Sequence, residues 1–130
     1  MQDLEFMKVI RQTLLENPIL SKTLSGVFTT PLVQDPFPYI TLNLESMEKG
    51  LGTTRLQCFL KVWSAYQGVK EIHELCAAVQ ACLEKPGISL TLPSGGQVVL
   101  KRSQQQMETS LEGFFKVTFR YDVLIQGEHL

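Results

Sequence analysis

Residues 53–84 read TTRLQCFLKVWSAYQGVKEIHELCAAVQACLE and contain the two patterns that decide the fold. From Thr54 to Ser64 apolar residues alternate with other residues, as in a β-strand, and from Gly68 to Glu84 they recur with the period of an α-helix. A half-apolar strand followed by an amphipathic helix is typical of a domain in which helices pack on a sheet. The apolar positions are Leu56, Cys58, Leu60 and Val62 in the strand, and Ile72, Leu75, Cys76, Val79 and Leu83 in the helix.

Further elements are expected on both sides of this stretch. An amphipathic helix over residues 3–16 is capped by Asp3 and ends at Asn17-Pro18, because proline disfavours helical geometry in the residue before it. A short helical turn at residues 19–24 and an irregular connection to Phe37 follow. Alternation predicts strands at residues 39–45, 88–92, 97–103 and 114–126, with residues 46–53 as a turn and 104–113 as a polar loop.

This order of elements predicts an α+β fold, with a single antiparallel sheet of about four to five strands and two helices packed on one face. The length of 130 residues suits one domain over residues 1–130, and neither an internal repeat nor a domain boundary is visible. A chain of this size buries about two-thirds of its unfolded surface, which is enough for one core.

Charge and composition argue against several classes of partner. The chain has 12 basic and 13 acidic residues, and the two signs are interspersed. A binder of nucleic acid usually carries a clustered basic stripe, and an anionic membrane also attracts basic clusters. Neither a signal peptide nor a membrane span is expected, and three cysteines without disulfide-type spacing suggest a reduced, cytoplasmic chain.

Few residues are candidates for chemistry. His73 and Cys76 lie one helical turn apart, so one alternative is a small cytoplasmic α+β enzyme or ligand-binding protein that uses this pair. However, Cys76 belongs to the apolar stripe, and a zinc site needs three or four protein ligands. Gly95-Gly96 is followed by a strand pattern and therefore predicts a β-turn rather than a phosphate loop. We expect no catalytic, cofactor-binding or metal-binding residue.

The second face of the strand over residues 54–64 is more informative, because it mixes aromatic and polar residues. Phe59 and Trp63 alternate there with Gln57 and Lys61, a combination that is enriched at protein interfaces. Scattered exposed aromatic residues are also normal on a monomer, and that alternative stays open. We expect a subunit interface at Tyr39, Gln57, Phe59, Lys61, Trp63, Lys116 and Arg120, and a charged replacement of Trp63 to weaken assembly without unfolding the chain.

Several stretches resemble a known family. "DPFPYITL" at residues 35–42, "TTRLQCFLKVWS", the helix "GVKEIHELCAAVQACLE" and "GFFKVTFRYDVLIQ" at residues 113–126 are similar to the small tail-completion proteins of long-tailed phages and gene transfer agents. The resemblance runs in order from about residue 3 to 126 and departs at the polar stretch "SQQQMETSLEG". None of these motifs is a catalytic signature.

The resemblance implies a structural virion protein, a tail terminator whose ring, commonly a hexamer, caps the tail tube and joins it to the head connector. The implied partners are further copies of the chain, the tail tube protein and a connector or stopper protein, while DNA only passes through. The implied location is the head-proximal end of the tail, after assembly in the host cytoplasm, and a cytoplasmic adaptor without a ring is a third possibility. Loops that dock to the tube or connector are expected at Met47, Glu48, Lys49, Leu51, Gln105, Met107 and Glu108.

Overall fold

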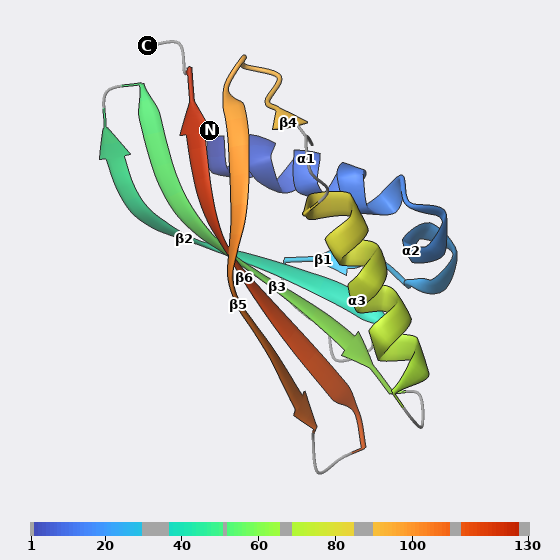
Figure 1. Cartoon of the computed structure of the whole chain (residues 1–130). Coiled ribbons are helices and arrows are strands. Elements are labelled where there is room, and N and C mark those ends of the chain that lie inside the picture. The colour runs from blue at the N-terminus through green and yellow to red at the C-terminus, as the bar shows by residue number, and fades with distance from the viewer. Residues whose placement is uncertain are drawn as a thin grey trace.

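Three helices cover one side of a twisted sheet (Figure 1). The computed structural model describes residues 2–29, 37–50, 52–65, 69–84, 90–109 and 113–127. Two long helices were expected, and the expected helical turn after Asn17-Pro18 is a third one. The helices are α1 (Gln2–Leu15), α2 (Pro18–Thr23) and α3 (Lys70–Leu83). No helix in the described part of the chain is long and apolar enough to cross a bilayer.

The sheet has six strands in the order β1-β2-β3-β6-β5-β4, which corrects the expected four to five. β1 pairs with β2 in parallel and the other neighbours are antiparallel, so the sheet is mixed rather than wholly antiparallel. β1 is two residues long, too short to show an alternating pattern in the sequence. The strands are β1 (Val27–Phe28), β2 (Tyr39–Gly50), β3 (Thr53–Ser64), β4 (Leu90–Thr91), β5 (Gln97–Thr109) and β6 (Phe115–Gln126).

Both segments that were expected to be turn or loop are mostly strand. β2 continues to pair with β3 as far as Gly50 opposite Thr53, and the chain reverses at Gly52, whose φ of 76° favours glycine. β5 pairs with β6 from Gln97 opposite Gln126 to Thr109 opposite Phe115. The prediction of a loop from residue 104 was therefore wrong. All side chains of residues 101–109 are exposed, so no burial pattern marks this strand in the sequence.

The junction between α1 and α2 has a local cause in the sequence. The Asn17 side-chain oxygen accepts hydrogen bonds from the backbone N–H groups of Ile19 at 2.9 Å and Leu20 at 3.2 Å. Pro18 occupies the first turn of α2, where its missing N–H leaves no hydrogen bond unmade. The Asn-Pro step that ends α1 therefore also starts α2.

The core lies between the helices and the inner sheet face, which is the face toward the helices. Alternate residues of β3 and β6 point into it, as the sequence predicts. The deepest side chains come from every layer: Phe6, Ile10 and Leu14 of α1, Leu20 of α2, Ile72 and Leu75 of α3, and Ile40, Leu42, Leu56, Leu60, Phe119 and Tyr121 of the sheet. The β5–β6 end of the sheet extends away from the helices (bottom of Figure 1), and β5 is exposed there on both faces, whereas Val117 of β6 is still buried.

Candidate assembly interface

The seven residues expected at a subunit interface lie together on the outer face, which is the sheet face opposite the helices. Cross-strand pairing sets their order: Tyr39 is opposite Trp63, and Trp63 is opposite Lys116 on its other side. Four residue pairs further along the two strands, Phe59 lies beside Arg120. The structure therefore brings together the set Tyr39, Gln57, Phe59, Lys61, Trp63, Lys116 and Arg120, although they come from three strands.

Trp63 belongs to a cluster of aromatic rings at one end of this face. Its ring centroid lies 5.8 Å from that of Tyr39 and 5.6 Å from that of Phe114, and Phe37 stacks on both of these rings. Phe28 of β1 meets Tyr39 edge-on at 6.1 Å. We call Phe28, Phe37, Tyr39, Trp63 and Phe114 the aromatic cluster. Offset and edge-on rings at these distances attract one another, so the cluster stabilises this end of the sheet.

Polar contacts hold Trp63 further. Its indole N–H donates to Thr41 Oγ1 at 3.1 Å, and the Lys116 ammonium lies 5.3 Å from the ring centroid. Tyr39 is 6% exposed and Thr41 1% exposed, while Trp63 is half-buried. Trp63 is thus a packed residue of this subunit as well as part of its surface. These contacts lead us to expect that a charged replacement of Trp63 destabilises the fold as well as weakening assembly.

Beyond the aromatic cluster the outer face becomes polar and carries paired charges. The Arg120 guanidinium lies 5.9 Å from the Phe59 ring centroid, and the Gln57 amide oxygen, oriented to satisfy its hydrogen bonds, accepts from Arg120 Nε at 3.1 Å. Gln57 is 7% exposed, so this hydrogen bond is largely shielded from water. Lys116 pairs with Glu108 of β5 at 3.3 Å. This part of the face is hollowed into two shallow depressions that meet at Arg120.

Most of the residues expected in docking loops lie in strands instead. Gln105, Met107 and Glu108 lie on strand β5, with Glu108 opposite Lys116 on the outer face and Met107 opposite Val117 on the inner face. Polar stretches such as this one suggest loops, but here the backbone pairs regularly with β6. Met47, Glu48 and Lys49 lie in β2, and their side chains, like the whole of Leu51, fall outside the described part of the chain.

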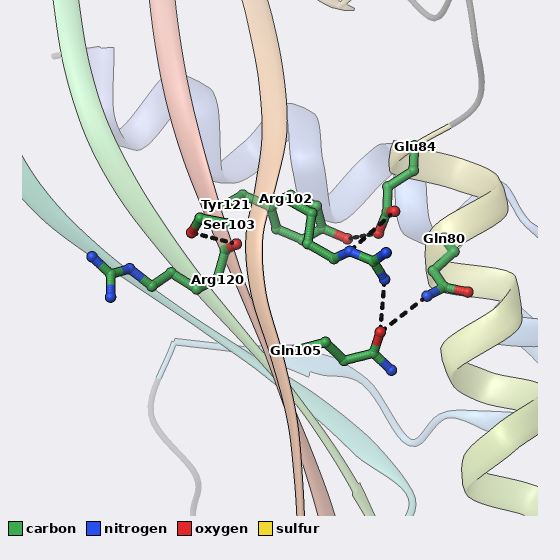
Figure 2. A network of polar contacts seen from close by, with 7 residues as sticks. All are labelled: Gln80, Glu84, Arg102, Ser103, Gln105, Arg120 and Tyr121. Carbon is green, nitrogen blue, oxygen red and sulfur yellow. Dashed lines mark hydrogen bonds and ion pairs between the residues drawn. The ribbon is translucent and has the colours of Figure 1, made fainter.

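A polar network ties the middle of β5 to α3 on the inner side (Figure 2). Glu84, which caps the end of α3, accepts a hydrogen bond from the Tyr121 hydroxyl at 2.8 Å and lies 3.5 Å from Arg102 Nε. Arg102 Nη1 and Gln80 Nε2 both donate to Gln105 Oε1, at 2.7 and 3.3 Å. These contacts lie beside the register shift between Arg102 and Gln104, where Ser103 is left out of the residue pairing and its hydroxyl donates to the Arg120 carbonyl oxygen of β6 at 3.1 Å (Figure 2).

The thiols give the enzyme alternative no support. Cys58 and Cys76 are buried, and burial raises the pKa of each to about 12, so neither thiol ionises near neutral pH. His73 is exposed on α3 while Cys76 faces the core, so the pair does not form a site. Within the described ranges, no group of three or more His, Cys, Asp and Glu residues is arranged to hold a metal ion.

Sequence reasoning missed part of this surface. Phe28 lies in a two-residue strand and Phe37 just before a strand, where alternation gives no signal, and Phe114 was predicted as strand but not assigned to the interface. The Glu84–Arg102–Gln105 network was missed because its members come from a helix end, an expected strand and an expected loop, which no local pattern connects. The signal that was available is the density of aromatic residues around "DPFPY" and "GFF".

Comparisons with known proteins agree on one family. The model of the family described as "Tail completion protein gp17" matches residues 8–126, which is most of the chain. Eighteen chains of solved structures match, and one of them belongs to the structure described as "Virion of native gene transfer agent (GTA) particle". It has a TM-score of 0.68 at 15% identity, and the match covers 92% of this chain and 93% of the other, which shows a shared fold. No curated protein sequence matches. The chain therefore belongs to the tail completion protein gp17 family and is a structural protein of the virion tail rather than an enzyme.

Proposed function

We propose that this chain is a tail terminator that forms a ring, caps the tail tube and joins it to the head. The observation that carries the proposal is the extent of the family match, which runs over residues 8–126 of the 130. The likeness to a chain of a gene transfer agent virion over 92% of this chain supports the same fold.

The proposed partners are further copies of the chain, a tail tube protein and a head connector or stopper protein. A hexamer is the proposed ring size. DNA passes through the ring and is not bound specifically, which agrees with a net charge of −1 and interspersed signs. We propose that Phe59, Lys61, Lys116 and Arg120 contact neighbouring proteins, because these outer-face side chains remain partly exposed within the subunit.

The protruding ends of the long strands are the proposed docking elements for tube and connector. Gly50 and Gly52 flank the β2–β3 reversal, and Thr109 and Gly113 flank the β5–β6 reversal. Side chains near the second reversal, including Met107 at 43% exposure, have little covering from this subunit. A partner protein that covers them buries apolar surface without any rearrangement of the core.

Deleting the gene from the phage or gene transfer agent that encodes it tests the proposal. We expect electron micrographs to show separate heads and tails, with tails that vary in length, because nothing stops tube growth or joins the tube to the head. Supplying the intact chain restores joined particles of uniform tail length. Joined particles with normal tails in the absence of the chain contradict the proposal.

A further inference from the structure

The sheet has two long edges that no described strand covers. β4 pairs with β5 only at Gln97 and Val98, and β1 pairs with β2 only at Ile40 and Thr41. Among the described strands, residues 99–109 of β5 and 42–50 of β2 therefore have a neighbour on one side only. Backbone N–H and C=O groups along such edges are available to a further strand.

Between Arg102 and Glu108, the β5 edge lacks the charges and prolines that protect edge strands in monomeric proteins. It is a long strand without proline, and residues 103–107 carry no charge. Val99 is 52% exposed and Met107 43% exposed, so apolar side chains flank the open backbone. The irregularity between Arg102 and Gln104 interrupts the pairing with β6 at one point only. An edge of this kind is an aggregation hazard unless another chain covers it.

Strand direction makes the two edges compatible. β2, β3, β6 and β5 are antiparallel to their neighbours in this order, so β2 and β5 run in opposite directions. When two copies stand side by side in the same orientation, β5 of one copy is therefore antiparallel to β2 of the next. The contact joins two different patches, which is the head-to-tail arrangement that builds closed rings.

Charge fixes which residues meet. Glu45 is paired with Gln57, Gln57 with Asp122, and Asp122 with Lys101, so Glu45 and Lys101 end the same cross-strand row at opposite edges of the sheet. Both side chains are exposed. In a sheet that continues from copy to copy without a shift, Lys101 of one copy lies beside Glu45 of the next. Opposite charges directly across two strands attract, whereas like charges repel.

We infer that copies of this chain join edge to edge, with β5 of one copy adding to β2 of the next and Lys101 facing Glu45. The inference rests on the proposed ring and names the strands that close it. The occupant of each edge is a second copy of the chain. Each copy carries both open edges, β5 and β2, which run antiparallel and carry opposite charges at Lys101 and Glu45. The outer faces of adjacent copies then form one continuous surface.

Disulfide trapping tests this pairing. Two variants, Glu45→Cys and Lys101→Cys, are made in a Cys82→Ser background, because Cys82 is the native thiol that is partly exposed. Directly paired antiparallel residues have Cα atoms about 4.5–5.5 Å apart, within the range that a disulfide spans. We expect a covalent dimer on mild oxidation of the mixed variants, and none from either variant alone. In the control mixture Arg55→Cys replaces Glu45→Cys. Arg55 is exposed but lies on central strand β3, away from the edge, so we expect no cross-link.

A charge exchange gives a second readout. Lys101→Glu should weaken self-association about tenfold in sedimentation experiments, because the contact changes from attraction to repulsion. Adding Glu45→Lys to the same chain should restore the association, since the pair is then complementary again. A matched control, Arg55→Glu, makes the same change of charge at an exposed position of central strand β3 and should not be rescued by Glu45→Lys.

The trapping is run on the purified chain and on particles that contain both cysteine variants. A mixed cross-link in either preparation supports the pairing, and its absence from both overturns it. A cross-link of Lys101→Cys with itself also overturns it, because two β5 edges then meet. Failure of the terminator proposal is visible separately, since deleting the gene changes tail length and joining whichever strands meet.

Discussion

Replacing Trp63 with alanine should cost about 3.5 kcal/mol in the free energy of unfolding, although the residue lies on the outer face. The variant loses ring contacts with Tyr39 and Phe114, at 5.8 and 5.6 Å, each worth ~1 kcal/mol beyond buried area. It also loses the 3.1 Å hydrogen bond to Thr41 Oγ1, worth ~1 kcal/mol. Lys116 loses its contact with the ring at 5.3 Å, worth ~0.5 kcal/mol.

Urea unfolding followed by far-UV circular dichroism measures this loss, because Trp63 is the chain's one tryptophan and its fluorescence disappears with it. For a chain of this size the loss corresponds to a decrease in Tm of about 12 °C. Trp63→Phe is the matched control: it keeps a ring in the aromatic cluster and removes the indole donor, so we expect a loss of only about 1 kcal/mol. Thr41→Val removes the acceptor instead and completes the comparison.

A different result would refute the reasoning. If Trp63→Ala unfolds at the same urea concentration as the parent chain but no longer assembles, Trp63 acts as an exposed interface anchor and its contacts within the subunit contribute little. If Trp63→Phe is as unstable as Trp63→Ala, the indole hydrogen bond rather than ring packing dominates.

Burial of thiols and of one tyrosine gives two more predictions. Burial raises the pKa of the Cys58 and Cys76 thiols to about 12 in the folded chain, above the ~8.5 of an unfolded thiol. The buried, protonated thiols therefore contribute fully to the free energy of unfolding below pH 8.5, and this contribution is lost as the pH rises toward 12. We expect stability to decrease by ~1.4 kcal/mol per pH unit for each thiol above pH 8.5, and urea titrations of a double Cys→Ala variant should lack this decrease. Tyr121→Phe removes the hydroxyl that donates to Glu84 at 2.8 Å and should cost about 1 kcal/mol by thermal unfolding; no change in Tm would show that water replaces that hydroxyl without loss.

The aromatic cluster changes how the outer face is understood. Aromatic residues on an uncovered sheet face suggest contact points for a partner, yet Tyr39 and Trp63 already pack against other rings of the same subunit. The partly exposed remainder, Phe59 with Lys61 and Arg120, keeps the character of an interface. The packed aromatic cluster beside a polar, hollowed region is typical of a surface that is preorganised before it binds its partners.

The alternation in residues 54–64 and 114–126 and the helical stripe in residues 68–84 were sufficient to predict helices on one face of a sheet and most of the core. These elements are readable because each buries one face, and burial on one face forces apolar residues to recur with the period of the element. The Asn17-Pro18 step was readable for a different reason, since its effects on the backbone are local. The family resemblance was carried by the same stretches.

Folding alone decides the features that have no burial pattern or that join distant residues. Strand β5 beyond Leu100 is exposed on both faces, so only its pairing with β6 makes it a strand, and the parallel β1 is too short to leave a pattern. The shared row of Glu45 and Lys101 depends on three successive strand pairings, each set by register. A shift of one residue in any of them would move a side chain to the opposite face, so the sequence alone cannot place these two charges together.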